Sequence, residues 1–401
     1  MTSNYKKLGQ YIKPINIRNK DLKVKRLLGV SIRKVLMPSI ANTVGTNMKT
    51  YKIIKKHQFA YGPVTSRNGD KISIALLEDF DEAIISQAYV VFEIIDTKLL
   101  NPEYLMMWFR RPEFDRYARY KSHGSVREIF DWEELCDTEL PIPSIEKQKE
   151  IVKEYNIVVN RIQLNEKLNQ KLEETAQALY KHWFVDFEFP NKEGKPYKSS
   201  GGEMVYNEEL DMEIPKGWSV ETIKDFCLDM KSGGTPSRTN VKFWNNNDVP
   251  WLKTGEIKNN IILSTKEFIS SKGLQNSSAK LLPINTVLMS MYGANAGEVG
   301  LLKIESSTNQ ACCGMICKDL NDASFLYYHL VVNQKFNHSQ AIGGAQQNLS
   351  KDYIENIKLV IPKNLNTYFL KNIIENKENN SRLIMELSTL KQLLLARMTK
   401  G

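Results

Sequence analysis

The sequence predicts an α+β fold in which two mixed α/β domains are each followed by a long helix, and the two helices pair as a coiled-coil spacer. Three observations predict this architecture: an internal repeat, apolar residues at helical spacing in two long segments, and short β-like runs alternating with a few helices elsewhere. A chain of 401 residues is long enough for two or three domains with substantial cores.

The internal repeat emerges when the chain is aligned with itself at an offset of 219 residues. Identical residues then coincide near the end of each half: Gly124 with Gly343, Leu140 with Leu359, Ile142 with Ile361, and Pro143 with Pro362. Upstream, residues 5–12 resemble residues 220–227, and residues 86–109 resemble residues 309–331 in pattern. Each half is therefore a globular segment that closes with a short strand, a proline and a long helix.

Changes in composition divide the chain into five segments. We expect a first domain over 1–143, a first spacer helix over 144–190, a linker over 191–213, a second domain over 214–362 and a second spacer helix over 363–401. The linker begins with "NKEGKPYKSSGGEM", which combines Gly, Ser, Pro and Lys and has no periodicity.

Apolar residues in the two long segments follow the three-and-four spacing of a coiled-coil seam. In the first helix these positions are Ile151, Tyr155, Val158, Ile162, Leu168, Leu172, Thr175 and Leu179. Asn165 occupies the expected seam position after Ile162, where a polar residue costs stability but fixes register. The second helix has Leu370, Ile374, Leu383, Leu387, Leu390 and Leu394, interrupted by the polar stretch 375–382. Since neither stripe is stable alone in water, we expect the helices to pack together; the alternative is two separate surface helices.

The net charge of +9 is concentrated near the start of the chain, where the first 75 residues contain sixteen Lys or Arg and only two acids, Asp21 and Asp70. Such a positive field favours a polyanion such as nucleic acid; the alternative is a merely soluble basic surface. Cys312, Cys313 and Cys317 match no common zinc spacing, so we expect reduced cysteines in a cytosolic protein and no metal. No apolar run approaches the ~18 residues of a membrane span, and no signal peptide is expected.

Several short strings imitate enzyme motifs but lack the context that the chemistry needs. "NPEY", at 101–104, approximates the Asn-Pro-Pro-Tyr box of amino-methyltransferases, but Glu103 replaces the second proline and no glycine-rich cofactor loop follows a strand. A helix start, with Asn101 as N-cap and Pro102 at the first position, fits better. "DFDEA" has no accompanying phosphate-binding loop, and "VDFEFPNKEGK" ends a helix rather than lying on paired strands. We therefore expect no catalytic residue.

Nearly the whole sequence resembles the specificity subunits of Type I restriction–modification systems. The resemblance rests on strings in both halves: "LPIPSIEKQKEIV", "AQALYKHWFVDFEFP", "IPKGWSVETIKDF", "SGGTPS", "VPWLKTGEI", "SSAKLLPINTVLMSMYGANAG", "TNQACC" and "GGAQQNLSKDYIENIKLVIP". The first half departs from the pattern. It lacks an "SGGTPS"-like string and has "AYGPVTSRNGDKISIA" where the second half has "VLMSMYGANAGEVGLL".

The resemblance implies two target recognition domains separated by two antiparallel helices, with a pseudo-twofold relation between the halves. It implies a noncatalytic chain that binds double-stranded DNA, two methyltransferase (M) subunits and restriction/translocase (R) subunits. The chain itself is expected to hold no cofactor; S-adenosylmethionine belongs to the partner methyltransferase subunit, and ATP and Mg to the partner restriction subunit. Because the halves differ in sequence, the target is expected to be bipartite and asymmetric with an unread spacer.

We expect read-out from polar loops next to glycines, because Asn and Gln suit adenine edges and Lys suits guanine or phosphate. In the first domain the candidate residues are Ser31, Arg33, Tyr61, Thr65, Arg67, Asn68, His123, Ser125 and Arg127. In the second domain they are Lys253, Thr254, Tyr292, Asn295, Gln346, Gln347 and Asn348. The alternative for each is a turn residue that satisfies its own loop.

Two other functions compete with this one. A single-chain adenine DNA methyltransferase with an unrecognised cofactor site would transfer methyl groups from S-adenosylmethionine without a partner. A coiled-coil adaptor with no DNA role would show no salt-sensitive retention of DNA, whereas a phosphate-binding protein loses affinity steeply as salt rises.

Overall fold

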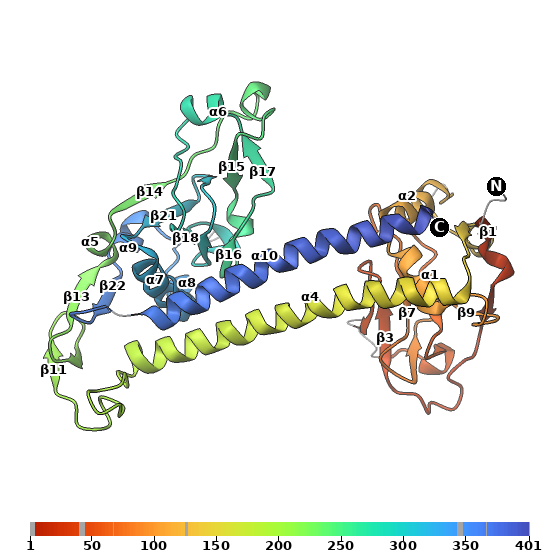
Figure 1. Cartoon of the computed structure of the whole chain (residues 1–401), viewed down its shortest axis with the longest axis horizontal. Helices are drawn as coiled ribbons and strands as arrows, with labels where there is room; N and C mark the ends of the chain where they lie inside the picture. Colours follow the sequence, from red (N-terminus) through yellow and green to blue (C-terminus); the bar gives the residue numbers. More distant parts are fainter. Residues whose placement is uncertain are drawn as a thin grey trace. The chain divides into compact units, whose positions relative to one another are not determined.

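The structure is a computed structural model that describes residues 5–39, 45–66, 68–124, 127–342, 348–365 and 367–400. It divides into two compact units: a first unit of Met1–Gln163 with Met385–Gly401, and a second unit of Leu164–Ile384. Each unit combines a mixed α/β domain with parts of two long helices, α4 (Ile145–Tyr180) and α10 (Tyr368–Arg397) (Figure 1). The predicted α+β class, with a long helix after each domain, is confirmed.

Among its described residues, the domain of the first unit contains two four-stranded sheets and three short α-helices. One sheet has the order β2 (Ile12–Ile15), β9 (Val90–Ile94), β6 (Phe59–Tyr61), β7 (Ile74–Leu76). The other has the order β4 (Leu36–Pro38), β3 (Leu27–Val30), β8 (Glu82–Ile85), β5 (Lys52–Lys55). A separate pair joins β1 (Tyr5–Lys7) to β10 (Glu139–Pro141), and the helices are α1 (Pro102–Phe109), α2 (Pro112–Tyr120) and α3 (Trp132–Cys136).

The domain of the second unit repeats this plan with an enlarged sheet. Its five-stranded sheet has the order β14 (Asp229–Ser232), β21 (Cys312–Ile316), β18 (Val287–Ser290), β19 (Val299–Leu302), β16 (Asn260–Ile262). A three-stranded sheet has the order β17 (Glu267–Ile269), β15 (Val249–Leu252), β20 (Ser307–Thr308). Two strand pairs complete it: β13 (Ser219–Thr222) with β22 (Lys358–Ile361), and β11 (Met204–Asn207) with β12 (Met212–Pro215). The helices are α5 (Ile223–Phe226), α6 (Ser271–Gln275), α7 (Leu320–Val332), α8 (Gln334–Ser339) and α9 (Lys351–Glu355).

The internal repeat is confirmed by backbone hydrogen bonds that recur in both domains. The antiparallel pair β1–β10 corresponds to β13–β22, and each pair precedes a long helix. Just after the first strand of each pair, Leu8 N donates to Thr138 O at 2.8 Å, and Ile223 N donates to Ile357 O at 2.9 Å. Thr138 and Ile357 are 219 residues apart, which is the offset that the sequence alignment uses.

Helix α1 begins where the "NPEY" string predicts a helix start. The Asn101 side chain accepts a hydrogen bond from Tyr104 N at 2.9 Å, and Pro102 occupies the first helical position. The helix then buries its apolar face against the sheet that contains β6 and β9. There the ring centres of Phe59 and Phe92 stack at 4.8 Å, and the ring of Phe109 packs edge-on against Phe59 at 5.9 Å. The predicted N-cap is confirmed, and it orients the helix toward an aromatic core.

The buried positions of α4 follow one continuous three-and-four spacing along the helix. This finding corrects part of the predicted coiled-coil seam. Buried side chains on this helix are Gln148, Val152, Tyr155, Val158, Ile162, Asn165, Ala176 and Tyr180. The predicted polar seam position at Asn165 is therefore confirmed. Leu168 and Thr175 are exposed, so their predicted seam positions are wrong. The reason is that the three-and-four spacing continues from Asn165 through Asn169 to Ala176, even though two of these positions are polar.

In the second unit the two helices run antiparallel and meet through polar side chains. Asn169 donates to the hydroxyl of Ser381 at 3.0 Å and accepts from Asn380 at 3.2 Å. One turn further along α4, Glu173 forms an ion pair with Lys377, so residue numbers rise on one helix as they fall on the other. The polar stretch 375–382, predicted to interrupt the seam, thus supplies its hydrogen-bonding partners.

The predicted linker is locally ordered by aromatic stacking. Tyr197 stacks on Phe189 at 4.5 Å, and Phe189 stacks on Trp218 at 4.9 Å. Gly202 lies against this stack so closely that a Cβ there would fall 2.4 Å from the Tyr197 ring. The composition predicted a linker without periodicity, and the aromatic stack holds this segment against the start of the second domain.

Within the described ranges, no helix has the length and apolar character needed to cross a membrane. All five cysteines are free thiols, and Cys227, Cys312 and Cys313 are buried.

Candidate nucleic-acid interface

The predicted read-out segments of the first domain come together at one end of β6. Phe130 N donates to Pro63 O and Thr65 N donates to Glu128 O, both at 2.9 Å. The Thr65 hydroxyl also contacts the Ser122 hydroxyl at 2.9 Å. The segment after β6 and the segment after α2, far apart in the sequence, therefore form a single loop pair.

A third read-out segment, the turn between β3 and β4, is attached to the same region by a buried ion pair. Lys34 Nζ lies 2.5 Å from Asp115 Oδ1 on α2 and donates to Ile72 O at 3.3 Å. Burial lowers the pKa of Lys34, and the Asp115 carboxylate opposes that effect. Within the turn, Lys34 N donates to Ser31 O at 2.9 Å and Arg33 N donates to the Ser31 hydroxyl at 3.1 Å. Ser31 therefore shapes the turn, while Arg33 is exposed on it.

The second domain builds the same loop pair with the same backbone bonds. Ile342 and Asn348 exchange two N–H···O bonds of 3.0 Å, as His123 and Ile129 exchange bonds of 3.1 and 2.9 Å. Both pairs are related by the 219-residue offset. Two loop pairs with corresponding backbone hydrogen bonds thus present different side chains.

These bonds also fix which residues of the two loops correspond, and they correct the prediction for Tyr61. Leu349 N bonds to Met291 O as Phe130 N bonds to Pro63 O, so Pro63 corresponds to Met291 and Tyr61 to Met289. Tyr61 lies in β6 with no exposed surface, its ring 6.3 Å from that of Phe92. The sequence prediction paired Tyr61 with Tyr292 because each is followed by glycine, and this pairing differs by three residues from the one that the backbone bonds define. In the structure, the exposed residue that corresponds to Tyr292 is Val64.

Thr65 is also placed differently from its prediction. Its side chain is buried, and its hydroxyl bonds to Ser122 and to Glu128 O. Thr65 therefore holds the loop pair together, as a turn residue that satisfies its own loop, and does not reach the surface.

The other predicted residues fall into three groups. Exposed side chains belong to Arg33, His123, Arg127, Lys253, Tyr292 and Asn348. Half-buried side chains belong to Ser31, Asn68, Thr254 and Asn295. Arg67, Ser125, Gln346 and Gln347 lie outside the described residues.

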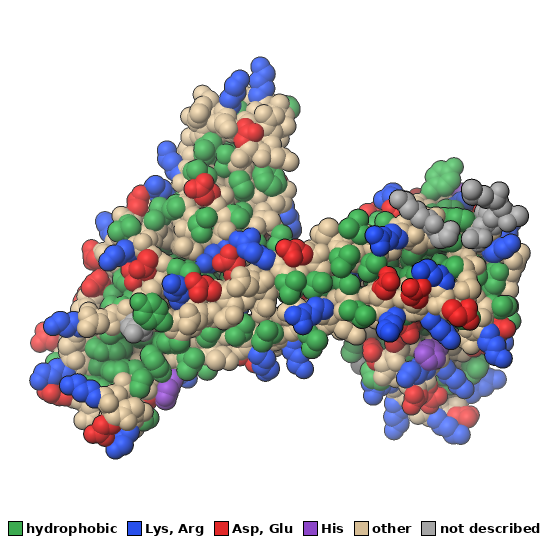
Figure 2. Space-filling view, in the orientation of Figure 1, with side chains coloured by type: hydrophobic (Ala, Val, Ile, Leu, Met, Phe, Trp, Pro, Cys, Tyr) green, Lys and Arg blue, Asp and Glu red, His purple; other side chains and the backbone are tan. Residues whose placement is uncertain are grey.

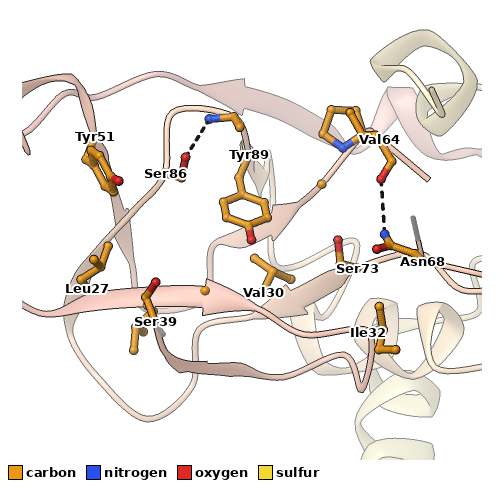
Figure 3. Close-up of a pocket in the computed structure, with 15 residues that line it drawn as sticks. Leu27, Val30, Ile32, Ser39, Tyr51, Val64, Asn68, Ser73, Ser86 and Tyr89 are labelled. Carbon is orange, nitrogen blue, oxygen red and sulfur yellow. Dashed lines mark hydrogen bonds between the residues drawn. The ribbon is translucent and has the colours of Figure 1, made fainter. Parts of the chain in front are cut away.

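A cavity of about 460 Å³ opens beside the loop pair of the first domain (Figure 3). Val30 and Ile32 line it from the β3 side, Val64 and Asn68 from the loop after β6, and Tyr89 extends into it from the segment before β9. Asn68 Nδ2 donates to Val64 O at 3.3 Å, and this hydrogen bond holds together the loop that lines this side of the cavity. Sequence reasoning missed this cavity because its walls come from several stretches that are separated along the chain.

A second cavity, of about 540 Å³, is lined in part by the β3–β4 turn and is rich in cations. Its lining includes the cationic residues Arg33, Lys34, Lys71, Arg110, Arg116 and Lys391, and the acidic residues Asp70 and Asp115. We call it the basic groove. On the face that Figure 2 shows, cationic and acidic side chains are interspersed. A net positive groove next to a read-out turn therefore stands out as a place for phosphate.

In the second domain, motifs that are distant in sequence converge around Trp251. Trp251 Nε1 donates to Gly234 O at 3.0 Å. A Cβ on Gly233 would lie 2.1 Å from Asn309 O, and one on Gly234 would lie 2.3 Å from the Ser278 hydroxyl oxygen. The "SGGTPS", "VPWLKTGEI", "SSAKLL" and "TNQACC" strings are therefore parts of one packed corner, and Gly233 and Gly234 are required there for close backbone approach.

That corner positions Lys253 through a charged cluster. Lys253 Nζ pairs with Glu267, and Glu267 also pairs with Arg238 at 2.7 Å. The Arg238 guanidinium lies 3.5 Å above the Trp244 ring and 4.9 Å from the Trp251 ring centre. Arg238 is a half-exposed cation that sequence reasoning missed, and its place directly after the "SGGTPS" string was the available signal.

Comparison with known proteins agrees with this geometry. The family described as "Type I restriction modification DNA specificity domain" matches residues 31–174 and 215–388. The Type I restriction enzyme HindI specificity subunit of Haemophilus influenzae is 25% identical over 425 residues, covering 92% of this chain and 91% of that protein. The MjaIX specificity subunit of Methanocaldococcus jannaschii is 26% identical over 309 residues, covering 75% of this chain and 68% of that protein.

The fold has a counterpart among solved structures. The crystal structure of a Type I restriction–modification system S subunit from M. genitalium superposes with a TM-score of 0.57 at 11% identity, covering 98% of this chain and 95% of that chain. None of these relatives is described as a single-chain methyltransferase or as an adaptor, so neither competing function is supported. The two family matches together span most of the 401 residues, one in each repeat, and the chain belongs to the Type I restriction modification DNA specificity family.

Proposed function

We propose that this DNA-specificity protein reads a bipartite, asymmetric target in double-stranded DNA, one half-site per domain, with an unread spacer between them. The observation that carries the proposal is the repeated loop pair, in which His123 and Ile129 make the same backbone bonds as Ile342 and Asn348. A common framework with different exposed side chains suits two half-sites of different sequence.

Apart from Ser31, which shapes its own turn, the exposed and half-buried residues of the loops are the proposed contacts. Arg33, Asn68, His123 and Arg127 would serve the first half-site, and Lys253, Thr254, Tyr292, Asn295 and Asn348 the second. Asn side chains suit adenine edges, whereas Arg and Lys suit guanine or phosphate. Gln346 and Gln347 remain proposed adenine contacts, and Arg67 and Ser125 remain proposed contacts of the first half-site.

The long helices support a role as spacer and docking surface. The polar pairs of Asn169 with Ser381 and of Glu173 with Lys377 favour one register over others, which would hold the half-sites at one separation. Ile157, Leu164 and Leu168 lie on one face of α4 and are exposed, so this stripe is available to an apolar partner. We propose that two methyltransferase subunits bind this chain, together with restriction/translocase subunits.

Catalysis would then reside in the partners. The methyltransferase subunits would bring S-adenosylmethionine, and the restriction subunits ATP and Mg. This chain would supply sequence choice and positioning.

A single-molecule map of adenine methylation in the host genome, with the gene intact and deleted, tests the proposal. Deletion should remove one bipartite, asymmetric motif whose spacer has a constant length. An unchanged map in a cell that expresses the protein would contradict it. A motif with two identical half-sites would contradict the assignment of one different half-site to each domain.

A further inference from the structure

Two apolar side chains are exposed side by side on the loop pair of the first domain. Val64 and Ile129 form an antiparallel bridge, flanked on either side by the two 2.9 Å backbone bonds that join the loop segments. In such a non-hydrogen-bonded pair the two side chains lie on the same face, with their Cβ atoms about 4.5–5.5 Å apart. Val64 is 36% exposed and Ile129 is 41% exposed, so both reach the surface of the proposed read-out region. We call these two residues the apolar pair.

The second domain has polar side chains at the two corresponding positions. Tyr292 and Asn348 form the equivalent antiparallel bridge, and both are exposed. They offer a hydroxyl and an amide, which can form hydrogen bonds with a base edge, whereas the apolar pair can make only apolar contacts. The two domains therefore present different chemistry at the same place in the repeat.

Exposed cations surround the apolar pair. Arg127, two residues before Ile129, is exposed, and Arg33 is exposed on the β3–β4 turn, whose Ile32 lines the same cavity as Val64 (Figure 3). An apolar protein surface would have to desolvate these arginines, whereas DNA neutralises them with phosphates. The apolar group that B-DNA presents in its major groove is the C5-methyl group of thymine. Charge and polarity together therefore favour a thymine-containing DNA edge as the ligand of the apolar pair.

We propose that Val64 and Ile129 are specificity-determining residues that recognise the C5-methyl group of a thymine in the first half-site. The proposal rests on the proposed function, because it requires the first domain to read one half-site. Contact with both side chains removes the methyl group from water, whereas a cytosine at the same place has no methyl group and sets a polar edge against the apolar pair. Tyr292 and Asn348 offer hydrogen bonds instead, so this thymine preference belongs to the first half-site.

The test uses the full chain produced with its methyltransferase subunits and a duplex that contains the motif found by methylation mapping. Each thymine of each half-site is replaced in turn by deoxyuridine, which pairs like thymine but lacks the C5-methyl group, and fluorescence anisotropy gives the dissociation constant. Val64→Ala and Ile129→Ala shorten exposed side chains without opening a core, and Val64→Ile keeps the apolar contact. Ile95→Ala is the matched control, because Ile95 is 54% exposed and follows the end of β9 opposite to the one that pairs with Tyr61.

One deoxyuridine substitution in the first half-site should weaken binding by about fourfold, which is the effect expected for removing one buried methyl group. Val64→Ala and Ile129→Ala should each bring this ratio closer to one, whereas Val64→Ile and Ile95→Ala should preserve it. No variant should change the response to deoxyuridine in the second half-site.

The proposal is overturned, with the bipartite specificity intact, by a first half-site without thymine or by a wild-type ratio near one at each of its thymines. A ratio that both alanine variants leave unchanged overturns it too. Tighter binding after 5-methylcytosine replaces cytosine, without any deoxyuridine effect, would assign the contact to methylated cytosine instead of thymine. Loss of methyltransferase binding in the alanine variants, with the deoxyuridine effect retained, would assign the apolar pair to a protein partner. A wild-type complex that selects no motif contradicts the proposed function itself.

Discussion

Lys34, in the turn between β3 and β4, forms a buried ion pair with Asp115 on α2 at 2.5 Å. Asp115 also accepts from Ile72 N at 3.1 Å, so one carboxylate holds two segments of the read-out region. Lys34 adopts a left-handed backbone conformation, with φ of 63°, which side chains rarely occupy unless the surroundings impose it. The pair therefore shapes the turn that carries Arg33.

Replacing one partner of this pair should destabilise the first unit more than replacing both. Asp115→Leu leaves a buried lysine charge without compensation and should cost about 3 kcal/mol of unfolding free energy. The double variant Lys34→Met with Asp115→Leu should recover most of that loss, because both buried charges are removed. Chemical denaturation followed by a signal from the first unit measures the difference. Equal losses in the single and double variants would argue against the ion pair as the anchor.

Acid should destabilise the second unit through His329. Its ring accepts or donates a 2.9 Å hydrogen bond with the Tyr180 hydroxyl, and burial lowers its pKa from 6.5 to about 4. Between those values the unfolded chain binds a proton that the folded chain does not. The free energy of unfolding should therefore fall as pH drops from 6.5 toward 4, by roughly 3 kcal/mol in total, and stay constant above that range with respect to this group.

The variant His329→Gln keeps a polar side chain beside Tyr180 and cannot titrate. Its melting temperature should respond less to pH between 6.5 and about 4 than that of the wild-type protein. Parallel melting curves for the two proteins across this range would exclude His329 as the source of the acid sensitivity.

Gly233 should tolerate no side chain, unlike Gly255 in the same domain. A Cβ on Gly233 would meet Asn309 O at 2.1 Å, whereas no atom lies within 4 Å of a Cβ on Gly255. Gly233→Ala should destabilise the second unit by at least about 2 kcal/mol through forced backbone movement, and Gly255→Ala should change stability by less than about 0.5 kcal/mol. Thermal unfolding of the two variants side by side makes the comparison, and similar melting temperatures would refute the packing argument.

Substitutions in the two loop pairs should affect the two half-sites independently. His123→Ala or Arg127→Ala should relax recognition of one half-site only, and Asn348→Ala, or Gln346→Ala with Gln347→Ala, should relax only the other. Tyr61→Phe should change neither, because Tyr61 is buried. Sequencing of methylated sites in cells carrying each variant gives the read-out. A double alanine change at Gln346 and Gln347 that left motif and affinity intact would remove these two residues from the proposed interface.

The basic groove should contribute to affinity but not to sequence choice. Neutralising Lys71, Arg116 or Lys391 to Gln should reduce the slope of log affinity against log salt by about 0.9 for each DNA phosphate that the protein no longer neutralises. The methylated motif should stay the same, because binding to phosphates carries no base information. Lys147→Gln, a change of an exposed lysine on α4 outside the groove, is the control. A triple variant with an unchanged salt slope would show that DNA does not enter the groove.

Local sequence was sufficient for the elements whose signals lie within a few residues. Asn101 and Pro102 predicted the start of α1, and the 219-residue offset predicted which strands and helices recur. The apolar spacing at Tyr155, Val158 and Ile162 predicted the seam of α4. Capping, proline geometry and helical periodicity act over one or two turns, so a sequence window contains their physical cause.

Tertiary structure alone decided which side chains reach the surface of the read-out region. Tyr61 and Tyr292 have the same local string, yet strand register buries the first and exposes the second. Lys34 is buried beside Asp115, which lies 81 residues away in the sequence. The polar seam of Asn169 and Ser381 depends on a partner 212 residues distant. Burial and pairing depend on segments that meet only after folding, because desolvation and hydrogen bonding are set by neighbours in space rather than in sequence.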